Sequence, residues 1–459
     1  MNQNYIIGLL FTGCCLLLSG CAGKIATHEE AVEGITAGKS DEKLVAKQWS
    51  SGESTGLVDD GWLKSFKDPQ LSALVDEAEK NNFGLKIAAA QVEQASALAV
   101  KAGAALKPTV GLSGGYAGRD TEALSELYGG SLAVSWEADV WGRIRSGVAG
   151  AEETLAATRS DFEFARQSLA ATTANAWFFA ISSKLLADTS NEIVELLQES
   201  VRIVESKETI GQGTMTDVHL GRAELATAQE AARQTLSAEE NAKRSLELLL
   251  GRYPSAQIET TNALVAVPPP VSAGIPSELL ERRPDLIAAE QQVAAAFYRQ
   301  KEAELLKLPR FSFSIGLSLN NLSDAASSLA AGVFAPLYTG GALEADIARA
   351  TAEQNEAIAA YAQTALQAFK EVETAMANEE HLMKQEEYLQ TVVSENYQAY
   401  ELLKKQYEIG VAEYLDVLTV QNKWIQARIA LINTSTQRLL NRVQLHLALG
   451  GSFEEPVQS

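Results

Sequence analysis

The sequence predicts a mainly α-helical fold of two similar halves, each built as a helix, a β-hairpin, a long helix and a further helix. Three observations predict it: residues recur at an offset of about 200, each half holds a long stretch without Gly or Pro, and each half contains segments of alternating apolar and small residues. Solenoid and propeller repeats have periods of roughly 20–50 residues. The longer period indicates a duplicated structural unit.

The duplication is visible in residues that recur in the same order. The residues recurring at an offset of 201 are Leu85, Ala88, Gln91, Val92, Ala95, Ala102 and Pro108, which return as Leu286, Ala289, Gln292, Val293, Ala296, Ala303 and Pro309. Those recurring at an offset of 199 are Ile210, Gly211, Asp217, Val218, Leu248, Leu250 and Gly251, which return as Ile409, Gly410, Asp416, Val417, Leu447, Leu449 and Gly450.

Two long helices are predicted from the absence of Gly and Pro. Residues 151–210 and 342–409 contain neither and are rich in strong helix formers. At about 1.5 Å per residue, each helix would be roughly 90–100 Å long. Such helices cannot be buried in one compact globule, so they must run along neighbours in coiled coils or an extended helical barrel.

Shorter helices are expected to lie along the long ones. A helical pattern resumes after each glycine and runs to Leu250 and Leu449, and Leu85–Lys107 and Leu286–Leu308 form further helices before the strands. The two shorter helices of each half together match one long helix in length. We expect them to stack end to end beside it.

The alternating segments predict strands with one apolar face. In the second half, the apolar residues Phe311, Phe313, Ile315, Leu317 and Leu319 alternate with serines and a glycine, and similar segments occupy 110–116 and 131–136; a fourth strand is expected around Leu329 to Leu337. The edge of a soluble β-sandwich would show the same alternation. The lack of charge and the small polar residues on the second face favour a membrane β-barrel.

Barrel closure then requires assembly. Two hairpins supply four strands, whereas membrane barrels need at least about eight because lipid does not tolerate open sheet edges. Two, three or four copies would supply eight, twelve or sixteen strands. A helical tube attached to the barrel would share its rotational symmetry.

The N-terminus predicts export and lipid attachment. Residues 1–20 carry no charged side chain, and their apolar core is too short to span a bilayer, which fits a signal peptide. Leu18-Ser19-Gly20-Cys21 resembles a bacterial lipobox, which makes Cys21 the lipid attachment site; a plain secretory signal with an incidental cysteine is the alternative. Residues 21–60 are then a lipidated strap, and Ala22 is not the Asp usually linked to inner-membrane retention.

Composition argues against several classes of function. The net charge of −21 argues against nucleic acid as a partner, since phosphate contacts require clustered Lys and Arg. The four histidines lie far apart in sequence, and signal removal and lipidation leave no thiol, so no metal site is expected. No nucleophile–base set and no phosphate-binding glycine loop is present, so we expect neither an enzyme nor a cofactor.

Several motifs carry a family resemblance over about residues 55–451. They are the turns Ile210-Gly211-Gln212-Gly213-Thr214-Met215-Thr216-Asp217-Val218 and Ile409-Gly410-Val411-Ala412-Glu413-Tyr414-Leu415-Asp416-Val417, the opening Gly61, Trp62, Leu63, Phe66, Asp68 and Pro69, and the segment from Ile275 to Asp285. Together they resemble the TolC-like outer-membrane efflux proteins. With the lipobox, the chain is most similar to their NodT or OprM-type lipoproteins.

The resemblance implies a homotrimer with a twelve-stranded outer-membrane barrel, continued by a long periplasmic α-helical barrel. Its tapered end would open on contact with a periplasmic adaptor protein, and an RND-type inner-membrane pump would supply energy and substrate. The implied function is a passive exit duct of a tripartite efflux system, which conducts drugs or other small toxic compounds to the exterior. Type I protein secretion and metal-ion efflux remain alternatives, as does a lipoprotein without a pore.

Both turns are candidate gate elements in that picture. Gly211 and Gly410 would end the long helices, because glycine tolerates the conformations that do so. Asp217 and Asp416 lie near the start of the returning helices, where either could cap the helix; alternatively, Asp416 forms a charged ring around the closed aperture. By resemblance, Tyr407 helps to latch the tip. Thr419 stands where the family pattern has a second Asp, and Ala412 stands where it has an Arg of the latch. These two departures predict a constriction with fewer charges and a weaker polar lock.

The expected organisation of the chain is as follows: 1–20 signal peptide, 21–60 strap, 61–252 first repeat with its hairpin at about 109–138, 253–280 linker, 281–451 second repeat with its hairpin at about 309–338, and 452–459 C-terminal tail.

Overall fold

The computed structural model describes residues 28–33, 45–51, 56, 58, 60–117, 127–320 and 324–454. The expected signal peptide and Cys21 lie outside the described residues, as does most of the strap. Short helices occur near the N-terminus and before the second half; they are α2 (His28–Glu33), α3 (Trp62–Ser65), α4 (Pro69–Asn81), η2 (Pro276–Glu278) and α8 (Leu279–Arg282).

The helices of the two halves correspond in order and in length. The long helices α6 (Arg143–Thr209) and α10 (Ala342–Glu408) each contain 67 residues. The helices that return from them, α7 (Met215–Leu249) and α11 (Tyr414–Ala448), each contain 35 residues. The helices before the strands, α5 (Phe83–Ala104) and α9 (Pro284–Leu305), each contain 22 residues. The duplicated sequence therefore folds as a duplicated structure.

The first long helix is longer at its N-terminal end than the glycine-free run 151–210 predicts, because it begins at Arg143. Gly147 and Gly150 lie inside α6, where it packs against α9. A Cβ on Gly150 would lie 3.4 Å from the carbonyl oxygen of Ala295 and the Cβ of Tyr298. Glycine here permits close helix approach and does not end the helix.

The strands form one antiparallel sheet in the order β1-β2-β3-β4. The strands are β1 (Thr109–Ala117), β2 (Leu127–Ala138), β3 (Arg310–Asn320) and β4 (Asp324–Phe334), so the fourth strand ends three residues before Leu337, where it was expected to end. Leu132 pairs with Leu112 on one side and Leu317 on the other. The register therefore collects large apolar residues on one face and serines, glycines and small residues on the other.

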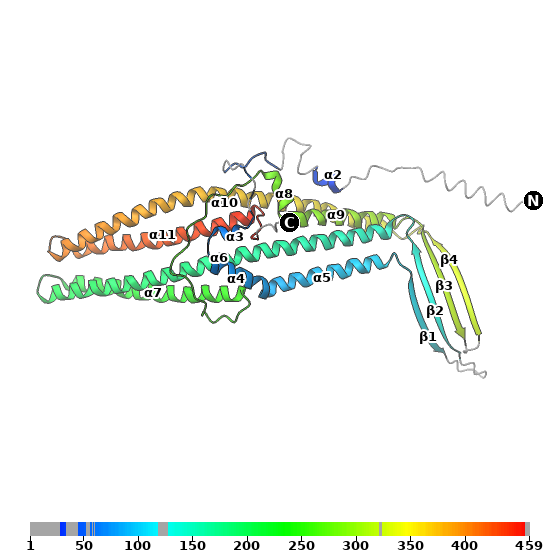
Figure 1. Cartoon of the computed structure of the whole chain (residues 1–459), viewed down its shortest axis with the longest axis horizontal. Helices are drawn as coiled ribbons and strands as arrows, with labels where there is room; N and C mark the ends of the chain where they lie inside the picture. The colour runs from blue at the N-terminus through cyan, green and yellow to red at the C-terminus, as the bar shows by residue number, and fades with distance from the viewer. Residues whose placement is uncertain are drawn as a thin grey trace, which may run out of the picture.

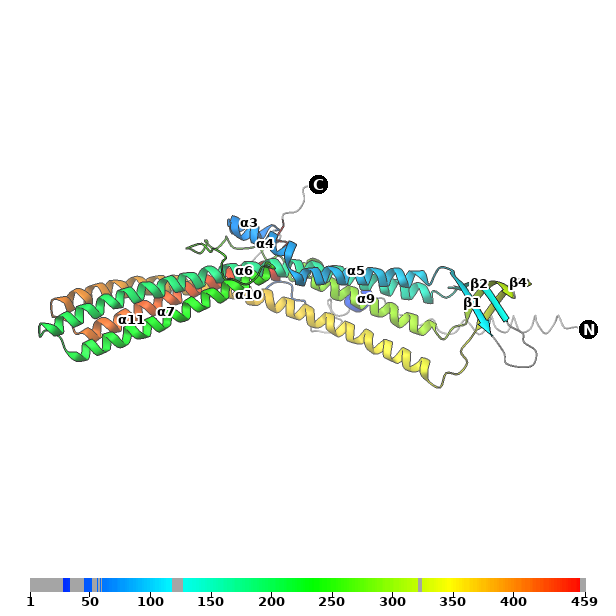
Figure 2. The same cartoon turned by 90° about the horizontal axis from the view of Figure 1, so that it is seen from below.

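The molecule is elongated, with the sheet at one end and two helix–turn–helix pairs at the other (Figures 1 and 2). α6 packs on α7 and α5, and α10 packs on α11 and α9. In each half, the two shorter helices lie end to end beside the long one, as the sequence predicts. Contacts between α6 and both α9 and α11 join the halves.

Among the described residues, buried apolar side chains form three separate clusters spaced along the length of the molecule. The cluster nearest the turns contains residues of α6, α10 and α11, including Ile193, Leu197, Tyr400, Val417 and Ile425. In the described part of the chain, we find no helix that combines the length and hydropathy needed to cross a membrane.

Candidate functional site at the paired helix turns

Both long helices end in the same backbone motif. Gly211 and Gly410 have φ values of 73° and 79°, in the left-handed region that L side chains avoid. The amide of Gly211 donates to the Glu208 carbonyl at 2.9 Å, and the next amide donates to Lys207 at 2.8 Å. The second turn repeats both bonds from Gly410 and Val411. These are Schellman ends, and their positive φ favours glycine at both turns.

The first turn has a side-chain cap that engages Asp217. The Oγ1 of Thr214 accepts from the Asp217 amide at 3.2 Å, while the Asp217 carboxylate accepts from the Thr214 amide at 3.2 Å and from its hydroxyl at 2.9 Å. This reciprocal pair is a capping box at the start of α7. The Asp217 carboxylate therefore stabilises the turn at the start of α7.

Asp416 occupies the equivalent position but has no such role. The residue at the cap of α11 is Glu413, whose side chain makes no capping bond in the described structure. Asp416 is exposed, and its carboxylate makes no hydrogen bond or ion pair with the described residues. Its negative charge is therefore open to the solution at the end of the molecule.

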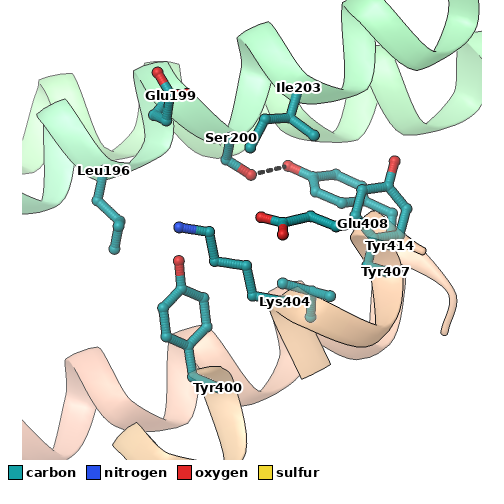
Figure 3. Close-up of a pocket in the computed structure, with 10 residues that line it drawn as sticks. Leu196, Glu199, Ser200, Ile203, Tyr400, Lys404, Tyr407, Glu408 and Tyr414 are labelled. Atoms are coloured by element: carbon teal, nitrogen blue, oxygen red, sulfur yellow. Dashed lines mark hydrogen bonds between the residues drawn. The ribbon is translucent and has the colours of Figure 1, made fainter. Parts of the chain in front are cut away.

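Tyrosines join the second turn to the first long helix (Figure 3). The rings of Tyr407 and Tyr414 lie 5.5 Å apart, and the hydroxyl of Tyr414 lies 3.0 Å from the Oγ of Ser200 on α6. Tyr400 stacks on Trp424 with ring centroids 5.6 Å apart. Burial raises the pKa of Tyr400 and of Tyr407 to about 12, and the nearby Asp217 carboxylate adds to the effect at Tyr407. The phenols therefore stay neutral at physiological pH.

Lys207 makes the most direct polar link between the two turns. It lies in the last turn of α6, donates from Nζ to the backbone carbonyl of Tyr407, and lies 4.1 Å from the centre of the Tyr407 ring. The sequence interpretation did not single out this residue. The available signal was a basic side chain in the last turn of a helix, where carbonyl groups attract cations.

The predicted tip residues gather at one end of the molecule. Gly211, Asp217, Tyr407, Gly410 and Asp416 all lie in or beside the two turns, with Tyr407 close to Asp217 and buried. Among the residues that the structure describes, no cluster of three or more His, Cys, Asp or Glu side chains is arranged to hold a metal ion.

Curated relatives cover nearly the whole chain. The pyoverdine export outer membrane protein OpmQ of Pseudomonas putida is 30% identical over 427 residues, which cover 88% of this chain and 91% of OpmQ. The outer membrane protein OprJ of Pseudomonas aeruginosa is 30% identical over 90% of this chain and 91% of its own length. The toluene efflux pump outer membrane protein TtgI of Pseudomonas putida is 30% identical over 95% and 97%, respectively.

Solved structures share the fold. The outer-membrane channel CmeC of Campylobacter jejuni superimposes with a TM-score of 0.82 at 24% identity, covering 90% of this chain and 92% of CmeC. The open state of the MtrE channel of Neisseria gonorrhoeae gives a TM-score of 0.81 at 23% identity, with coverages of 90% and 97%.

The sequence profile described as outer membrane efflux protein matches residues 74–252 and 275–451, one segment in each half. The expected resemblance and outer-membrane location are thus confirmed, as is the expectation of a non-enzymatic efflux channel. The chain belongs to the outer membrane efflux protein family.

Proposed function

We propose that three copies of this chain close a twelve-stranded barrel in the outer membrane, which a periplasmic helical tube extends into the exit duct of a tripartite efflux system. The observation that carries this proposal is the open sheet. β1 and β4 are its edges and have no further partner strand in the described chain. Because lipid cannot satisfy their free backbone groups, β1 of one copy would pair with β4 of the next.

The two faces of the sheet support this orientation. Leu112 and Leu329 lie on the large apolar face and are 82% and 80% exposed. On the other face, the hydroxyls of Ser113 and Ser131 lie 2.8 Å apart, and Thr109 and Ser135 form a similar pair at 2.7 Å. Lipid would cover the apolar face, and the hydroxyl groups would line the aqueous lumen.

The helix turns support contact with a periplasmic adaptor. Large apolar side chains are exposed around both turns; they are Ile210, Met215, Ile409, Val411 and Leu415. Exposed apolar groups concentrated at one end of a molecule are typical of a protein-binding surface. The adaptor would bind there and open the tip, and an RND-type inner-membrane pump would deliver the substrate.

Small organic compounds are the proposed substrates. Relatives are named for export of pyoverdine and efflux of toluene, and we extend this substrate class to the present chain. Type I protein secretion and metal-ion efflux remain alternatives that deletion of the gene, followed by a screen of toxic compounds, would separate.

Lipid on Cys21 would anchor the N-terminal strap in the outer membrane. Residues 45–51, at its far end, are held against α10: the amides of Ser50 and Ser51 donate to the Glu373 carboxylate at 2.7 and 2.9 Å. The indole of Trp49 donates to the Ala273 carbonyl at 3.0 Å, inside the proposed linker 253–280. The strap would thereby tie the lipid to the middle of the helical tube.

Conductance of the purified protein tests the proposal. In a planar bilayer, the wild type should show small, mostly closed and cation-preferring events, and crosslinks between β1 and β4 should produce trimers. A protein that inserts no conducting species, or assembles only as a monomer, would disprove the duct.

A further inference from the structure

A glutamine occupies a core position of the tip. Gln421 on α11 is only 1% exposed. Val417 and Leu418 lie one turn before it and Ile425 one turn after it, and all three belong to the apolar cluster nearest the turns. Because residues three or four apart share a helix face, Gln421 lies within the apolar stripe of α11. That helix packs against α10 and α6.

Both polar atoms of Gln421 are unpaired. Its Oε1 and Nε2 are closed to water and make no hydrogen bond with the described residues. A buried amide that has lost its hydration without gaining partners destabilises the packed state. A neighbouring copy cannot supply those partners without reshaping the packing, because the side chain is already covered within one protomer. The hydroxyl of Tyr407 is a second unpaired buried group in the same cluster.

We propose that Gln421 sets the opening threshold of the tip. Its unpaired amide raises the free energy of the arrangement in which α11 is packed with α10 and α6, and the amide becomes hydrated when this packing loosens. The penalty is thus present when the tip is packed and relieved when it opens. This inference rests on the proposed function, in which the tip of an efflux duct opens and closes.

Replacing Gln421→Met tests the proposal, because methionine has a similar length and removes both polar groups. In planar bilayers, we expect the open probability of the full-length assembly to fall about tenfold, the ratio that corresponds to about 1.4 kcal/mol. Hydrogen exchange of the α11 amides around residue 421 should slow in parallel. Gln426→Met, on the exposed side of the same helix, is the matched control and should change neither quantity.

Three outcomes would overturn the proposal: unchanged opening and exchange in Gln421→Met, faster exchange, or an equal effect in Gln426→Met. If Gln421→Met does not assemble, Gln421→Glu tests the opposite direction, because a buried charge should favour opening and raise the open probability at neutral pH. A wild type that never conducts disproves the proposed duct. The exchange comparison then decides by itself whether Gln421 destabilises the tip.

Discussion

The two tip turns begin with the same backbone motif and continue with different side chains. Each leaves a 67-residue helix through a left-handed glycine with two matching amide–carbonyl bonds. The first turn then closes with the Thr214–Asp217 capping box, whereas the second has Glu413 without a side-chain cap and Asp416 exposed. The second turn also carries the tyrosine contacts to α6.

Because of this difference, the aspartates at equivalent positions of the two turns have different surroundings. Where Thr214 stands at the cap, the Asp217 carboxylate is bound within its own turn, because it accepts from the Thr214 amide and from the Thr214 hydroxyl. Where Glu413 stands instead, the aspartate at the equivalent position has no side-chain partner in the described structure. The two halves therefore share the end of the long helix and differ at the start of the next helix, where Asp416 is exposed.

The largest expected effect concerns the feature that the turns share. Gly211→Ala and Gly410→Ala should each destabilise their turn by about 1–2 kcal/mol, because a Cβ is disfavoured at positive φ. Faster hydrogen exchange in the last turns of α6 and α10 would measure the loss. Gly103→Ala, inside α5, is the control and should not destabilise its helix. Markedly unequal losses at the two turns would show that their backbone motifs are not equivalent in solution.

A smaller effect should separate the two aspartates. Asp217→Ala removes the capping box and should cost about 1 kcal/mol, seen as faster exchange at the start of α7. Asp416→Ala should cost only a few tenths of a kcal/mol from the helix dipole, yet lower the cation preference of single channels. If Asp416→Ala leaves selectivity unchanged and loosens α11 as much as Asp217→Ala loosens α7, then Asp416 is a helix cap.

The sequence predicted those features that depend on local pattern. Runs without Gly or Pro located the long helices, alternation located β3, and the glycines at 211 and 410 located the turns, because each signal lies within a short segment. The predicted start of the first long helix was too late, because Gly150 lies inside α6. A glycine is kept there by close packing on α9, which is a tertiary contact. Alternation also placed β4 too late, since its small residues give a weak pattern.

Contacts between the halves could not be predicted from these patterns. Lys207 and Tyr407 are 200 positions apart, and their link depends on how the ends of α6 and α10 are placed. The missing Arg at position 412 predicted a weak polar lock; the Lys207 contact supplies a different polar link. The sequence left open whether either aspartate caps its helix, and the structure distinguishes them: Asp217 joins Thr214 in a capping box, whereas Asp416 is exposed.

The smallest effect appears only at alkaline pH and concerns the buried Tyr407 beside the second turn. Tyr407 has its pKa raised by burial from its ordinary value near 10 to about 12, so the packed tip favours the neutral phenol. The stabilisation is complete below about pH 10 and is lost as the pH rises through about 12. Tyrosinate absorbance of the wild type should show late-titrating groups, because burial also raises the pKa of Tyr361 and Tyr400 to about 12, and Tyr407→Phe should reduce that late absorbance change by one tyrosine. Titration of Tyr407 near pH 10 would mean that the ring is hydrated, and that the second turn does not pack against α6 in solution.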